Sequence, residues 1–193
     1  MTEGLLSGTR YLIRRKTLRL FGGEFRVLGP DGRQVLYADM KAFKLKEDIR
    51  LYTGDDKRTE ALTIKARSII DWAAAYDVTD PATGQKIGAL KRKGWKSLIK
   101  DEWILMDTDD REIGIIREDS TLLALVRRFL TNLVPQTFHM EMEGAPVARF
   151  KQHFNPFVLK LEVDFSADFA KALDRRLGLA AGVLLCAIEG RQS

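Results

Sequence analysis

The sequence predicts a mainly β fold, in which about twelve short strands form a sandwich or barrel around an apolar C-terminal helix. Two patterns indicate the strands: apolar and polar residues alternate over many short runs, and clusters of Gly, Pro and Asp separate these runs. The third observation is the uncharged run Leu177–Ile188 near the end of the chain. A helix that is apolar on every side has to be surrounded, and the inner faces of the strands are the available surroundings.

The alternation is clearest in three segments. From Phe43 to Tyr52 the apolar residues occupy the odd positions, with Glu47 as the exception, and similar patterns occupy 62–67 and 157–164. Because successive side chains of a strand point to opposite faces, we predict strands with one face in a core and one in water. The turns between strands are expected at Gly29–Gly32, Thr53–Asp56, Asp80–Gly84, Asp107–Asp110 and Glu143–Pro146.

The C-terminal helix is predicted to follow Ser166 as its N-cap, with Asp168 in its first turn. Its apolar part is about 18 Å long, too short to span a hydrocarbon layer of ~30 Å. Gly178 and Gly182 keep the helix thin enough for close packing by strands, and Cys186 is expected to be an inert buried thiol. A second, shorter helix is expected near 121–133, where it would pack against the sheet.

Composition limits the class of protein. The chain has 193 residues without a Pro-rich or low-complexity linker, so we expect one domain over residues 1–193. A formal net charge of +5 permits contact with phosphates or an anionic membrane surface without requiring either. One cysteine excludes an internal disulfide and a cysteine-based zinc site, and the first residues lack a signal-peptide pattern. We therefore expect a cytoplasmic protein, with peripheral attachment to a membrane as one option.

Two segments carry a resemblance to a known family. YDVTDPATGQKIGALKRKGWKSLIKDEWILMD, from Tyr76, and DFSADFAKALDRRLGLAAGVLLCAIEG, from Asp164, resemble the Tubby C-terminal-like superfamily, in particular its LURP-one-related and phospholipid scramblase-like members. The resemblance implies a closed twelve-stranded antiparallel barrel around a central hydrophobic C-terminal helix. It also implies binding of anionic lipid such as phosphoinositide headgroups. The segment corresponding to the scramblase calcium site, Val163–Asp168, offers two carboxylates, fewer oxygen ligands than calcium prefers.

The densest basic stretch is the candidate site for anionic headgroups. Each exposed cation near an anionic membrane contributes about 1 kcal/mol, and a Trp would rest at the interface. Phosphates of a nucleic acid could use the same groups, and the alternative is a solvated strand end with a packed Trp. A smaller basic cluster, 14–16, allows the same alternatives. The candidate lipid- or anion-binding residues are Lys91, Arg92, Lys93, Trp95, Lys96 and Lys100.

The sequence contains no nucleophile elbow, P-loop or dinucleotide fingerprint. DTDDRE at 107–112 lacks the Gly and Glu of a calcium loop and is interpreted as a hairpin turn, and His139 and His153 are interpreted as surface residues. No cofactor or metal is expected. We predict a non-enzymatic protein that binds anionic phospholipid or a protein partner. The alternatives are a nucleic-acid-binding or regulatory module, or an enzyme whose site is assembled from scattered residues.

Overall fold

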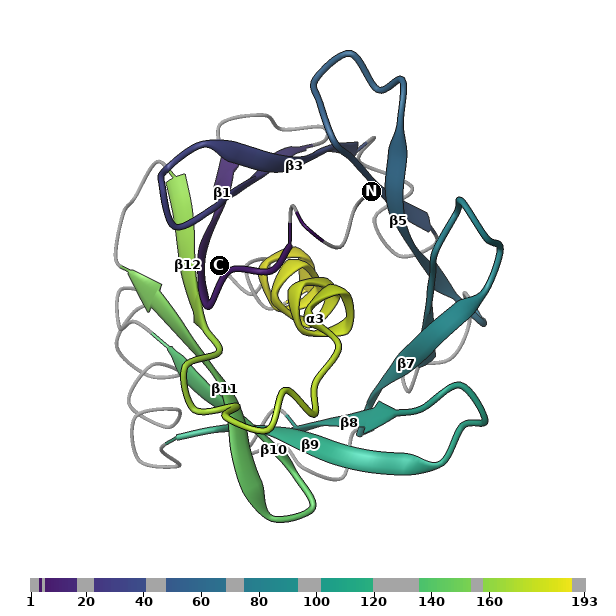
Figure 1. Cartoon of the computed structure of the whole chain (residues 1–193), viewed down its shortest axis with the longest axis vertical. Coiled ribbons are helices and arrows are strands. Elements are labelled where there is room, and N and C mark those ends of the chain that lie inside the picture. Colours follow the sequence, from purple (N-terminus) through teal and green to yellow (C-terminus); the bar gives the residue numbers. More distant parts are fainter. Residues whose placement is uncertain are drawn as a thin grey trace.

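Twelve antiparallel strands close into a barrel in the computed structural model of the chain (Figure 1), which describes residues 4, 6–16, 23–40, 48–68, 75–93, 102–119, 136–153 and 158–188. The elements are β1 (Arg10–Lys16), β2 (Gly23–Leu28), β3 (Gln34–Met40), β4 (Asp48–Tyr52), β5 (Glu60–Ala66), β6 (Ala75–Thr79), β7 (Lys86–Arg92), β8 (Glu102–Met106), β9 (Glu112–Glu118), β10 (Thr137–Met142), β11 (Ala145–His153), β12 (Val158–Asp164) and the helix α3 (Arg175–Ile188). The predicted number of strands and the closed barrel are confirmed.

The barrel closes between its first and last strands. β1 pairs with β12 from Arg10↔Asp164 to Lys16↔Val158. All the remaining pairs join strands that are consecutive in the sequence. Since the strands alternate in direction, the five hairpin turns all lie at one end of the barrel, which we call the turn end. α3 also starts at the turn end, because it follows β12 directly.

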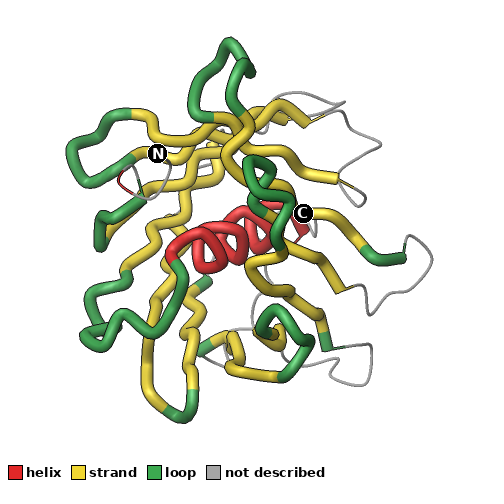
Figure 2. The backbone as a smooth tube through the Cα atoms, turned by 45° about the vertical axis from the view of Figure 1, so that its right-hand side comes forward, coloured by secondary structure: helices red, strands yellow, loops and turns green. Residues whose placement is uncertain are grey.

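The inner face of the barrel is apolar and packs against α3. All residues from Leu177 to Ala187 are buried, and Figure 2 shows the helix running between the strands. A Cβ atom on Gly182 would lie 2.7 Å from Cδ1 of Ile13 in β1, and one on Gly88 in β7 would lie 2.8 Å from Cδ2 of Leu177. The helix therefore contacts opposite walls of the barrel, which is consistent with the predicted central position.

The start of α3 differs from the prediction. The helix begins at Arg175, and its N-cap is Asp174: the Asp174 carbonyl accepts from Gly178 N at 3.1 Å and the carboxylate accepts from Arg176 N at 2.8 Å. Ser166 is therefore not the N-cap, and Asp168 lies outside the helix. Asp168 instead holds the preceding loop, because its buried carboxylate accepts from Ala172 N and Leu173 N at 2.9 and 3.2 Å.

An arginine that points into the barrel caps the C-terminal end of α3. Arg15 Nη1 donates to the carbonyl oxygen of Cys186 at 2.8 Å, and the guanidinium lies 5.6 Å from the centre of the Phe25 ring. A cation at this position complements the negative end of the helix dipole. The Cys186 thiol is buried, as predicted, and burial raises its pKa to about 12.

Some predicted elements are covered only in part. The predicted helix near 121–133 lies outside the described residues, and so do residues 43–47 of the strand expected over 43–52, whose remainder is β4. Among the described residues, no helix is long and apolar enough to cross a membrane.

Candidate anion-binding surface

The predicted basic cluster begins at the end of β7. Of its six residues, Lys91, Arg92 and Lys93 lie within the described part of the chain, whereas Trp95, Lys96 and Lys100 fall outside it. Lys91 and Lys93 are exposed and Arg92 is half-buried.

Lys93 is engaged in an ion pair on the outer wall. Its Nζ lies 3.1 Å from Oε2 of Glu102 in β8, and Oε1 of the same carboxylate lies 3.3 Å from Arg117 Nε in β9. Partial burial raises the pKa of Glu102, but the hydrogen bond and charge of Lys93, with those of Arg117, hold it below its ordinary value. The carboxylate of Glu102 thus offsets part of the positive charge that the sequence places here.

A second basic surface lies on the opposite wall, where the barrel closes. Arg26, Arg14, Lys160 and His153 are successive partners across β2, β1, β12 and β11: Arg14 pairs with Arg26 on one side and Lys160 on the other, and Lys160 pairs with His153. The strand neighbours of Arg14 and Arg26 are buried, and so is Leu161 beside Lys160, so these cations belong to the outer wall. His153 is the direct partner of Lys160 and lies on the same side of the sheet.

More cations surround this row. We call the outer wall of β2, β1, β12 and β11 the cationic face. Among the side chains that the structure describes on this face, six are Lys or Arg and three are carboxylates, those of Glu24, Glu162 and Asp164. Its cations are Arg10, Arg14, Arg26, Arg149, Lys151 and Lys160.

Two of these cations are neutralised within the protein. Arg10 Nε lies 3.1 Å from Asp164 Oδ2, and Arg26 Nη2 lies 3.0 Å from Asp55 Oδ2. The other four form no ion pair or side-chain hydrogen bond with any described residue: Arg14, Arg149, Lys151 and Lys160. Like charges directly opposite each other on neighbouring strands destabilise a sheet, so the Arg14–Lys160 pair has an electrostatic cost that a bound anion would relieve.

The two basic surfaces cannot act together on one flat ligand. β7 is six strands away from β1 in either direction around the twelve-stranded barrel, and Figure 1 shows the two strands on opposite sides of α3. The predicted cluster and the cationic face are therefore alternatives for contact with a planar surface.

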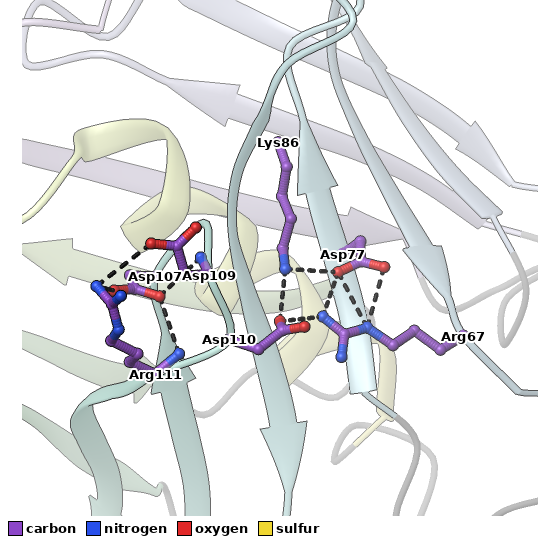
Figure 3. Close-up of polar contacts among 7 residues, drawn as sticks. All are labelled: Arg67, Asp77, Lys86, Asp107, Asp109, Asp110 and Arg111. Atoms are coloured by element: carbon purple, nitrogen blue, oxygen red, sulfur yellow. Dashed lines mark hydrogen bonds and ion pairs between the residues drawn. The ribbon is translucent and has the colours of Figure 1, made fainter.

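A third group of charges, which extends from the end of β5 to the β8–β9 turn, is balanced internally. In Figure 3, Arg67 lies between Asp77 and Asp110. Arg67 Nε donates to both Asp77 oxygens at 3.0 Å, its Nη2 donates to Asp110, and Lys86 Nζ donates to Asp110. These pairs connect the end of β5, β6 and β7 to the β8–β9 turn and leave little net charge for a ligand.

This network makes the stability of the fold depend on pH in the acidic range. Hydrogen bonds from Arg67 and then Lys86 lower the pKa of Asp110 to about 2. Since the unfolded pKa is about 3.9, the folded protein binds fewer protons between those values, and stability falls as the pH drops through that window. We expect Asp110→Asn to flatten this decline in urea midpoints measured across the acidic range. Parallel profiles for the variant and the wild type would contradict this assignment.

The DTDD segment is a hairpin turn, as predicted. The Asp107 carboxylate accepts from the backbone N of Asp109 and of Arg111 at 2.8 and 2.9 Å (Figure 3).

The two histidines are half-buried on the outer wall, where His139 pairs with Asp119 at 2.7 Å and His153 with Glu162 at 3.0 Å. Within the described ranges, no group of His, Cys, Asp and Glu is arranged to hold a metal ion.

The smaller cluster at 14–16 is divided by the strand geometry. Arg14 points to the outer wall, whereas Arg15 points inward and closes the helix. The cationic face was missed from the sequence because Arg14 and Lys160 are 146 positions apart and meet only when β1 pairs with β12. The one signal available in the sequence was that Arg14 and Lys160 each occupy the outward side of a strand with alternating polarity.

Comparison with known proteins agrees with this architecture. The family model described as LURP-one-related matches residues 34–186, which covers most of the barrel and nearly all of α3. No curated protein matches the chain. The protein therefore belongs to the LURP-one-related family, within the Tubby-like C-terminal superfamily.

Proposed function

We propose that the chain, as a single domain over residues 1–193, is a non-enzymatic barrel that binds anionic phospholipid headgroups through its cationic face. Its proposed location is the cytoplasm, with reversible attachment to a membrane surface. Membership of the superfamily supports a lipid-binding role, since the resemblance implies such binding by related barrels.

The observation that carries the proposal is the row of basic residues across four adjacent strands. Arg14 and Lys160 are direct cross-strand neighbours, and neither has an ion-pair partner among the described residues. Phosphate and carboxylate groups of anionic lipids would supply the missing counter-charge across a surface several strands wide. Arg14 and Lys160 lie on the two middle strands of this row, β1 and β12, so both can face one planar bilayer.

Neutralising this row should weaken binding to membranes. Each cation near an anionic bilayer contributes about 1 kcal/mol, so the double variant Arg14→Gln/Lys160→Gln should bind about 30-fold more weakly. The measurement is co-sedimentation with phosphatidylcholine vesicles that contain about 30% phosphatidylserine, at physiological salt. Vesicles of phosphatidylcholine alone should retain neither protein.

A matched variant tests the predicted cluster on the opposite wall. Lys91→Gln/Lys93→Gln removes the same charge at the end of β7 and should retain binding close to that of the wild type. If this variant loses binding and the first does not, the cationic face is the wrong surface and the sequence-predicted cluster is the site. Equal retention of the wild type on neutral and anionic vesicles would contradict lipid binding altogether, and preferential binding of a DNA duplex would support the nucleic-acid alternative.

A further inference from the structure

One large apolar side chain is exposed to solvent at the turn end of the barrel. Phe169 is 93% exposed, and among the described residues it is the one large hydrophobic side chain that is exposed. It lies in the loop Phe165–Asp174, which connects β12 to α3. The preceding aromatic residue of this loop, Phe165, is by contrast 1% exposed.

The loop holds this phenylalanine outward. The Asp168 side chain is 1% exposed and, besides two backbone N–H groups, accepts from Arg175 Nη1 at 2.7 Å. Phe165 packs below the loop, edge-on to Tyr11 and 4.7 Å from the Arg175 guanidinium. With its neighbour Asp168 fixed in the interior, Phe169 cannot turn inward without breaking these buried contacts.

The exposed part of the loop is free of negative charge. Its exposed residues are Ser166, Ala167, Phe169, Ala170, Lys171 and Ala172. By contrast, four of the five hairpin turns at this end expose a carboxylate: Asp31, Asp55 with Asp56, Asp109 with Asp110, and Glu143. The one exposed charge of this loop is that of Lys171, which suits the loop to approach an anionic surface.

The loop is also continuous with the cationic face. It leaves from the end of β12, where Phe165 N donates to Thr9 O at 2.8 Å beside the start of β1. Arg10, at that start, and Arg149, the partner of Asp164 in β11, are exposed cations of the face next to the loop. An aromatic side chain beside surface cations is an arrangement that favours the membrane interface.

We infer that Phe169 inserts into the interfacial region of an anionic bilayer when the cationic face is bound, which fixes the turn end toward the membrane. This inference rests on the proposed function. Burial of a phenylalanine ring changes a binding constant by more than a factor of ten when the ring is fully buried. Phe169→Ala should therefore weaken vesicle binding about tenfold. Because Phe169 is exposed, the same substitution should leave the thermal midpoint of unfolding unchanged.

The insertion can be observed directly with a fluorescent probe. Cys186 is buried and its pKa is raised, so a thiol reagent at neutral pH should label only the introduced cysteine of Phe169→Cys. An environment-sensitive dye there should shift to the blue on the phosphatidylserine vesicles and be quenched by lipids labelled in the acyl chain. The same dye on Ala82→Cys, in the β6–β7 turn on the opposite wall, should show neither change.

The outcomes separate the inference from the proposed function. If Arg14→Gln/Lys160→Gln weakens vesicle binding but the dye at 169 stays in water and Phe169→Ala binds like the wild type, the insertion is wrong and the cationic face stands. If the wild type does not bind the vesicles, both proposals fail. A dye response caused by protein concentration without vesicles would overturn the insertion and show that Phe169 contacts a second copy of the chain.

Discussion

Replacing Asp168 by Asn is expected to lower the free energy of unfolding by about 3 kcal/mol, because it leaves a buried cation without its counter-charge. The Arg175 side chain is 15% exposed and its Nη1 lies 2.7 Å from Asp168 Oδ2. The same carboxylate accepts from the backbone N–H groups of Ala172 and Leu173. An amide retains one acceptor oxygen, so the variant would lose both the charge and part of the loop's hydrogen bonding.

Urea denaturation measures this effect, and an exposed aspartate provides the control. Asp31 also accepts a backbone hydrogen bond, from Arg33 N at 3.0 Å, but its side chain is 57% exposed. Asp31→Asn should therefore change stability by less than about 0.5 kcal/mol. A similarly small effect of Asp168→Asn would mean that the loop before α3 is not anchored as described.

Gly178→Val is the second variant with a large expected effect, about 3 kcal/mol of destabilisation from overpacking. A Cβ atom at this position would lie 2.5 and 2.8 Å from Cε1 and Cζ of the Phe165 ring. That ring cannot move freely, since it packs against Tyr11 and Arg175. Because residue 178 faces Phe165 and Leu173 of the loop before α3, a larger side chain has to displace the helix or the ring.

Alanine substitutions separate this steric effect from helix propensity. Gly→Ala in a helix favours folding by about 1 kcal/mol, so Gly178→Ala and Gly182→Ala start with the same gain. At Gly182 the nearest atom is the flexible end of Ile13, which can shift, whereas at Gly178 it is the packed aromatic ring. We expect Gly182→Ala to be close to neutral and Gly178→Ala to be destabilising; equal gains for both would show that α3 is not tightly enclosed.

The fold was largely predictable because each strand has a local signature. The polar side of β12, for example, is already visible as Lys160, Glu162 and Asp164, and the turns are marked by Gly, Pro and Asp. The start of α3 was predicted wrongly because Ser166 and Asp168 have the residue types of a helix start. Only the tertiary structure shows that Asp168 is buried in a loop and that Asp174 caps the helix.

The candidate surface was less accessible to sequence reasoning. The stretch from Lys91 to Lys100 stands out because its cations are neighbours in the chain, yet Lys93 is offset by Glu102 from the next strand. Arg14 and Lys160 belong to the first and last strands, and their proximity depends on closure of the barrel. Local charge density therefore identifies the cluster that begins at Lys91, whereas the cationic face depends on the pairing of distant strands.

The enclosure of α3 by the protein's own strands is the central claim, and amide hydrogen exchange of the monomer without lipid tests it most directly. If the strands enclose the helix, the amides of residues 179–187 should exchange only through global unfolding, with a protection free energy equal to that from urea denaturation. Exchange within seconds, or protection that appears only with added vesicles or at high protein concentration, would contradict the claim and show that lipid or a second molecule covers the helix.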